Sequence, residues 1–177
     1  LVIDYDAIKA EAKEDAALNA KLQAIEGSEG KKDSYVLRVF DAQNGNDLGA
    51  VLVDTGKLSF RVLWATTVRD TVLVGDSINR TLVYSLKSGA QKGKILGDPR
   101  AISNDGSKML IETNKGAADL YDIATLKVLA HFTFPSRIVH AEFTAEANKL
   151  MVLTADQSVY QVNVEGAPAS AQTASTK

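Results

Sequence analysis

The residue types that could carry out nucleophilic or acid–base chemistry are scarce in this chain. Ser77 stands in the tripeptide Gly75-Asp76-Ser77, and a serine nucleophile needs a histidine base held close to it. The two histidines of the sequence are His131 and His140. Neither has an aspartate three residues before it, the Asp-x-x-His spacing that would supply such a base. We therefore interpret the tripeptide as a turn.

Two further stretches have residue types that bind metals. His140 and Glu142 are two residues apart in a predicted strand and so share one face, but two ligands are too few for a closed zinc site. There is no cysteine to add to them. The loop from Asp41 to Asp47 has the composition of a calcium loop, yet Gly45 falls at its fifth position and no glutamate follows at the twelfth. We predict a half-buried strand histidine, a hairpin turn at Asn44-Gly45, and no cofactor or metal.

Composition excludes several classes of protein. The 177 residues carry a net charge of -2, which gives no general attraction for nucleic acid or anionic lipid. No apolar run approaches the roughly 20 residues of a membrane helix, so we expect a soluble protein of the cytoplasm or periplasm. No phosphate-binding glycine loop is present. The chain begins with Leu1 and its first residues do not read as a signal peptide, so we expect that its true N-terminus has been lost.

Three zones organise the chain. Residues 1-33 form an excursion, in which Asp6 to Glu26 are almost all strong helix formers and Gly27 to Asp33 form a polar linker. Residues 34-165 are rich in Val, Leu, Ile, Tyr and Phe, interrupted by turn residues. Residues 166-177 are mostly Ala, Ser, Thr and Gln, and we predict a flexible tail there.

The central zone has the pattern of consecutive antiparallel strands. We predict an all-β body with strands at Tyr35–Asp41, Leu48–Asp54, Phe60–Thr67, Thr71–Asp76, Arg80–Leu86, Lys92–Leu96, Pro99–Ser103, Lys108–Thr113, Ala117–Ile123, Lys127–Phe134, Arg137–Thr144, Lys149–Thr154 and Ser158–Val164.

Two landmarks recur in this zone at intervals of roughly 40 residues. The first is an aromatic residue near the end of a strand, found at Phe40, Tyr84, Tyr121 and Tyr160. The second is an apolar triplet, which begins at Val72, Met109 and Met151. A period near 40 residues with four strands in each unit is typical of β-propeller blades.

One stretch has the turns of a single blade. It runs from Ser103 to Thr125 and contains the turns Asp105-Gly106 and Asn114-Lys115-Gly116, followed by Tyr121-Asp122 at the end of a strand. It resembles the blades of WD-repeat proteins and related bacterial β-propellers. In that family such turns join the first strand to the second and the second to the third, and an aromatic-Asp pair closes the third. The resemblance extends over about residues 35–164.

Burial should differ between the strands of such a blade. Inner strands are covered on both faces, so Val72-Leu73-Val74 and Leu110-Ile111 should be fully buried. Outer strands meet water, which suits the lysines of Lys92–Leu96. Trp64 lies in a predicted inner strand, where a large aromatic side chain usually packs between blades.

The strand count predicts an incomplete ring. If Leu1–Tyr5 is a fourteenth strand, the chain holds about 3.5 four-stranded antiparallel blades and one N-terminal α-helix, half of a seven-bladed propeller. Upstream blades of the same chain, or a second copy forming a homodimer, would then close the ring.

The function that fits best is a non-catalytic propeller repeat module, acting as a protein-interaction scaffold within a larger bacterial protein. Its recognition residues would lie in the turns at one end of the blades. These candidates are Asp76, Asn79, Asp98, Arg100, Asn114, Lys115, Arg137, Asp156 and Gln157. The alternative is half of a catalytic propeller, a quinone-dependent dehydrogenase or a hydrolase, with its active-site residues in missing blades.

Overall fold

The computed structural model describes residues 16, 19–20, 34–54, 61–164 and 172–173 of the chain. The predicted strand Leu1–Tyr5 and the linker Gly27–Asp33 lie outside these residues. So does the predicted helix Asp6–Glu26, apart from three residues that are helical, Ala16, Asn19 and Ala20. In the described part of the chain no helix has the length and apolarity needed to cross a membrane.

The described residues form an all-β body, and each of the thirteen predicted strands is present. Their ends differ from the prediction by a few residues at most. The strands are β1 Ser34–Phe40, β2 Asp47–Asp54, β3 Val62–Val68, β4 Thr71–Asp76, β5 Arg80–Ser85, β6 Gln91–Leu96, β7 Asp98–Ile102, β8 Lys108–Asn114, β9 Ala117–Asp122, β10 Val128–Thr133, β11 Ile138–Phe143, β12 Lys149–Thr154, β13 Val159–Asn163 and β14 Gln172–Thr173.

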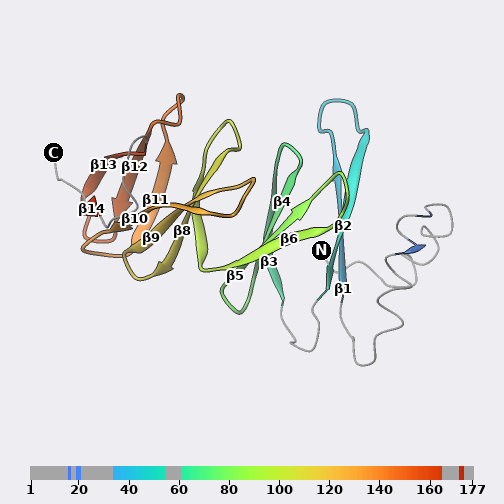
Figure 1. The fold of residues 1–177 in the computed structure, drawn as a ribbon, viewed down its shortest axis with the longest axis horizontal. Helices are drawn as coiled ribbons and strands as arrows, with labels where there is room; N and C mark the ends of the chain where they lie inside the picture. Colours follow the sequence, from blue (N-terminus) through green and yellow to red (C-terminus); the bar gives the residue numbers. More distant parts are fainter. Residues whose placement is uncertain (1–15, 17–18, 21–33, 55–60, 165–171, 174–177) are drawn as a thin grey trace. The chain divides into compact units, whose positions relative to one another are not determined.

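Strands that follow one another in the sequence are neighbours in each sheet (Figure 1). The hairpin β1-β2 comes first, then the sheet β3-β4-β5-β6, the sheet β7-β8-β9-β10, and the three-stranded sheet β11-β12-β13. The short strand β14, which was not predicted, pairs parallel to β10 at the outer edge of its sheet. Consecutive four-stranded sheets of this kind are blades of a partial β-propeller.

The chain divides into two compact units, the first comprising residues 1–78 and 82–93 and the second residues 79–81 and 94–177. In the first unit, valines of β2 and β4 pack with three residues of β5 and its end, Leu82, Tyr84 and Leu86. All six residues of β4 are buried, which confirms the prediction for Val72-Leu73-Val74. Lys92 is exposed on β6, as predicted for an outer strand.

Trp64 packs within its own sheet. It pairs with Gly75 of the neighbouring strand β4. A Cβ atom placed on Gly75 would lie 2.0 Å from the indole Nε1 of Trp64, so the ring lies directly over the glycine. Gly75 is therefore needed because a larger residue would displace the indole.

The core of the second unit lies between the sheet β7–β10 and the sheet β11–β13 (Figure 1). Leu110 and Leu120 of the first sheet belong to one buried cluster with Leu150 and Val152 of the second. The rings of Phe134 and Tyr160 are 5.5 Å apart at their centroids and tilted, a favourable aromatic arrangement. Leu110 and Ile111 have no exposed surface, as predicted for an inner strand, and Met109 beside them is also fully buried.

Equivalent backbone hydrogen bonds recur at the end of the third strand in three successive sheets. Leu86 N–H donates to Asp70, Ile123 N–H to Ser107, and Val164 N–H to Asn148. Two residues earlier in each strand stand Tyr84, Tyr121 and Val162. The recurring interval is confirmed, but the aromatic landmark at Tyr160 is displaced by two residues. A shift of two keeps the side chain on the same face of its strand, which explains why Tyr160 is nevertheless buried.

Candidate interaction surface

Three equivalent turns join the second strand of a sheet to the third. Each contains one residue with a left-handed backbone: Asn79 with φ 61°, Gly116 with φ 73° and Gln157 with φ 66°. The carbonyl of Asn79 accepts a hydrogen bond from Gly97 N–H, and that of Gly116 accepts one from Phe134 N–H. These two turns are thereby attached to the connection that leads into the next sheet.

Within the second unit, these connections surround a hollow of about 320 Å³, which we call the turn-end hollow. Its lining consists of polar and charged residues: Asn79, Asp98, Arg100, Glu112, Thr113, Asn114, Lys115 and Arg137. They come from the β4–β5 turn, β7, β8, the β8–β9 turn and the residue before β11.

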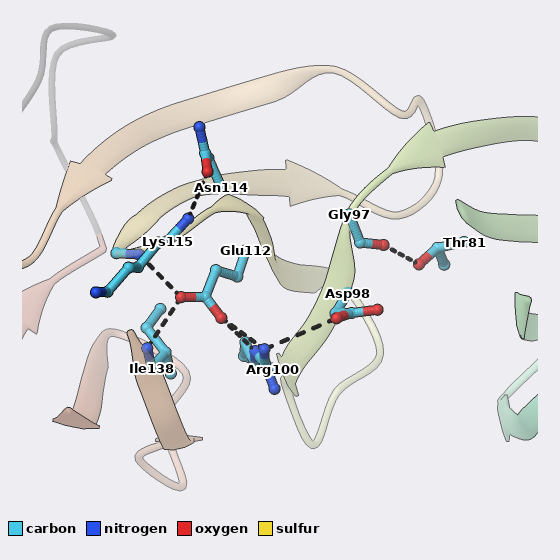
Figure 2. Close-up of polar contacts among 9 residues, drawn as sticks. Thr81, Gly97, Asp98, Arg100, Glu112, Asn114, Lys115 and Ile138 are labelled. Atoms are coloured by element: carbon cyan, nitrogen blue, oxygen red, sulfur yellow. Dashed lines mark hydrogen bonds and ion pairs between the residues drawn. The ribbon is translucent and has the colours of Figure 1, made fainter. Parts of the chain in front are cut away.

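Glu112 organises the hollow, and its carboxylate accepts hydrogen bonds on both oxygens (Figure 2). Its Oε2 atom accepts a hydrogen bond from Nε–H of Arg100 at 2.8 Å. The same oxygen forms an ion pair with a terminal guanidinium nitrogen of Arg100 at 2.6 Å. Its Oε1 receives the backbone N–H of Gly116 at 3.0 Å and that of Ile138 at 2.9 Å. The side chain of Glu112 is only 4% exposed, and its buried charge is paired with the guanidinium of Arg100. One side chain thus holds the β8–β9 turn, β7 and β11 together.

Two weaker contacts complete the wall of the hollow. Asp98 is exposed, and its carboxylate lies 3.8 Å from the guanidinium of Arg100. The Thr81 hydroxyl donates to the carbonyl of Gly97 at 3.0 Å (Figure 2). Because Thr81 is fully buried, its hydrogen bond to Gly97 holds the chain in place just before β7.

The structure brings six of the nine predicted residues together in the hollow: Asn79, Asp98, Arg100, Asn114, Lys115 and Arg137. Asp156 and Gln157 lie exposed in the β12–β13 turn. Asp76 is 2% exposed in the first unit, where its carboxylate accepts the N–H of Ile78. Sequence reasoning missed Glu112 and Thr113. The signal for Glu112 was an acidic residue directly after the apolar triplet of an inner strand.

Asp156 is used within its own turn. Its carboxylate accepts hydrogen bonds from the Thr154 hydroxyl and the Ser158 N–H. The hydroxyl bond is the main reason why the pKa of Asp156 lies below its ordinary value.

The residues first considered for chemistry have structural partners. Ser77 lies in the β4–β5 turn, as predicted, and its hydroxyl oxygen accepts the N–H of Arg61 at 2.9 Å. Asn44-Gly45 forms the predicted turn between β1 and β2, in which Gly45 N–H donates to the Asp41 carbonyl. No group of three His, Cys, Asp or Glu side chains with metal-ligand geometry occurs among the residues the structure describes.

Both histidines lie on exposed strand faces. The Nδ1 atom of His131 is 2.7 Å from a carboxylate oxygen of Asp119. The Tyr121 hydroxyl is 3.5 Å from the other oxygen, and burial together with this carboxylate raises the pKa of Tyr121. The prediction of a half-buried His140 is wrong, because its side chain is 68% exposed, 3.9 Å from Glu142. It projects from the face of β11 that does not contribute to the core.

Comparison with known proteins identifies the fold. No protein-family model matches the chain, and no curated protein does. The β-propeller domain of Cps50 (Swd1) from Myceliophteria thermophila is 13% identical, with a TM-score of 0.51 over 62% of this chain and 39% of that one. A chain of the Mitotic Checkpoint Complex is 12% identical, with a TM-score of 0.56 over 75% of this chain and 42% of that one. The chain therefore spans about two fifths of either neighbour, and its fold is that of WD-repeat-like propeller blades.

Proposed function

We propose that this chain is a non-catalytic β-propeller module that binds another protein at the turn-end hollow. The observation that carries the proposal is the network of Glu112, which holds the β8–β9 turn, strand β7 and the start of strand β11 in one arrangement. A surface held in this way loses little conformational entropy on binding, and such preorganisation favours recognition.

The residues around this network support binding rather than catalysis. The hollow is open and polar, and its lining contains neither histidine nor serine. The buried acid of the lining, Glu112, already accepts three hydrogen bonds and forms an ion pair with Arg100. A general base needs an oxygen that is available to take a proton from the substrate. The lining therefore provides polar contacts on a rigid support.

Selection of peptide ligands tests the proposal. A random-peptide phage library would be selected on the 177-residue chain, and binding of the recovered peptides would be mapped by hydrogen exchange. We expect slower exchange around Gly116 and Ile138. Exchange should not change around Gly106 and Leu126, which lie in the turns at the other end of the same strands.

Two results would contradict the proposal. One is recovery of no binding peptide, or protection confined to the opposite end of the strands. The other is catalytic turnover by the purified chain with ester substrates or with a quinone as electron acceptor, which would favour the enzymatic alternative.

We also infer that further blades of the same polypeptide complete a ring around these sheets. The sheet β11–β13 has three strands, whereas the sheet β3–β6 has four and the sheet that contains β7–β10 has five, so β13 is an edge strand among the described residues. On the outer face of the sheet β11–β13, Met151 is 37% exposed and Val159 is 50% exposed. Exposed apolar residues beside an unpaired strand edge favour association with another sheet.

Light scattering on the 177-residue chain tests this inference. We expect self-association that increases with concentration, because no sheet of the described residues covers the outer face. A defined dimer would indicate closure by a second copy instead of further blades. A stable monomer that binds no hydrophobic dye would contradict the inference.

A further inference from the structure

We propose that the turn-end hollow binds the carboxylate side chain of an extended acidic peptide segment, between Lys115 and Arg137. This proposal rests on the proposed function and specifies the class of partner.

The main acceptors of the hollow already have donors. The Oε1 atom of Glu112 accepts two hydrogen bonds, and its Oε2 atom accepts one from Arg100 and is ion-paired with the same guanidinium. The side-chain oxygen of Asn114 accepts the N–H of Lys115 at 2.8 Å. Arg100 is the one cation that has a buried partner, since its guanidinium is held by Glu112. A ligand donor could reach Glu112 or the side-chain oxygen of Asn114 only by displacing one of these bonds, which leaves the exposed carboxylate of Asp98 as the accessible acceptor.

The groups that remain are mostly donors. Lys115 and Arg137 are exposed, and no ion pair joins either side chain to another residue in the described part of the chain. The amide NH₂ of Asn114 is a third donor, because its oxygen is the atom that accepts the bond from Lys115. Cations and amide donors without acceptors bind carboxylates through charge-assisted hydrogen bonds.

Glu112 also explains why the two cations flank one site. Its Oε1 atom accepts hydrogen bonds from the backbone N–H groups of both Gly116 and Ile138, so the backbones of these two residues meet at one oxygen. Lys115 directly precedes Gly116, and Arg137 directly precedes Ile138. The backbones that carry the two cations are therefore fixed next to each other, although they belong to different sheets.

The size and remaining charge of the hollow favour a peptide over a polyanion. A volume of about 320 Å³ is at the low end for small-molecule sites and suits one or two side chains. Asp98, an exposed residue of the lining, can accept a backbone N–H of an extended peptide, a contact that a run of phosphates has no donor to make. The chain's net charge of -2 gives no long-range attraction for nucleic acid.

Fluorescence anisotropy tests the proposal with a labelled synthetic peptide that has two adjacent glutamates in a glycine and serine context. We expect saturable binding to the 177-residue chain, which weakens as salt is raised. The same peptide with glutamines should bind at least about tenfold more weakly, since charge-assisted hydrogen bonds are lost.

Variants locate the site. Lys115→Gln and Arg137→Gln should each weaken binding by about tenfold, and the double variant by more than either. The matched control is Lys127→Gln, which removes the same charge from an exposed residue of the β9–β10 turn. This control should leave the affinity within about twofold, because exposed charges that distant are screened by salt.

The outcomes separate this proposal from the proposed function. If selected peptides bind at the hollow but glutamate and glutamine peptides bind equally, the acidic-peptide proposal fails and the interaction module stands. If inorganic phosphate or an oligonucleotide binds better than the glutamate peptide, the site is a general anion site and the proposal is overturned. If Lys127→Gln weakens binding as much as Lys115→Gln does, the hollow is not the site.

Discussion

Two equivalent turns of the second unit, β8–β9 and β12–β13, have the same backbone and different connections. Each places a left-handed residue at the same point, Gly116 in one and Gln157 in the other. In the strand before the turn, Glu112 in β8 corresponds to Leu153 in β12. Glu112 bonds to residues 12 and 26 positions away, whereas Asp156 bonds only to neighbours two positions away. A repeated turn becomes a candidate binding site when one strand residue links it both to a neighbouring strand and to another sheet.

Of the changes that test this difference between the two turns, Glu112→Ala should lower the free energy of unfolding most. It leaves the guanidinium of Arg100 and the N–H groups of Gly116 and Ile138 without their acceptor. Removing one partner from a buried ion pair typically lowers the free energy of unfolding by about 3 kcal/mol or more. Urea unfolding of the 177-residue chain measures this loss.

The matched change in the other turn is Asp156→Ala. Asp156 is fully exposed and its bonds are local, so we expect a smaller decrease in the free energy of unfolding than for Glu112→Ala. Equal effects of the two variants would show that the network of Glu112 contributes no more than a local turn contact.

Gly116→Ala should have the next largest effect. Its φ of 73° is unfavourable for alanine, and the added Cβ would lie 2.4 Å from the carbonyl oxygen of Phe134. We expect a loss of about 2 kcal/mol, measured by urea unfolding. Gln157→Gly at the equivalent position should change stability by less than about 1 kcal/mol. Tolerance of alanine at Gly116 would contradict the close packing of this turn against the following connection.

Asp105 in the β7–β8 turn should make a smaller contribution, which changes with pH in the acid range. The Ser103 hydroxyl and the Ser107 N–H donate to Asp105 and lower its pKa to about 2. A lowered pKa in the folded state stabilises the fold above the ordinary value of 3.8, and this contribution is lost as pH falls towards about 2. Asp105→Asn should therefore reduce the dependence of Tm on pH over that range. An unchanged dependence would show that Asp105 does not contribute to it.

The features predicted from sequence were local ones. The Asn44-Gly45 turn, the buried triplet Val72–Val74 and the strand pattern each follow from a few adjacent residues. The role of Glu112 could not be predicted in this way, because its partners Arg100 and Ile138 are brought to it by the pairing and packing of whole sheets. The exposure of His140 likewise depends on what covers one face of β11, which strand periodicity does not specify.

The most direct test of the account is an NMR titration of the 177-residue chain with the glutamate peptide, following individual backbone amides. We expect the amide signals of Gly116 and Ile138 to shift together with one affinity, because both N–H groups donate to the same Glu112 oxygen at the turn-end hollow. The signals of Gly106 and Leu126 should remain in place. Shifts confined to Gly106 and Leu126, or no shift at Gly116 and Ile138 while the peptide binds, would contradict the assignment of the hollow as the binding site.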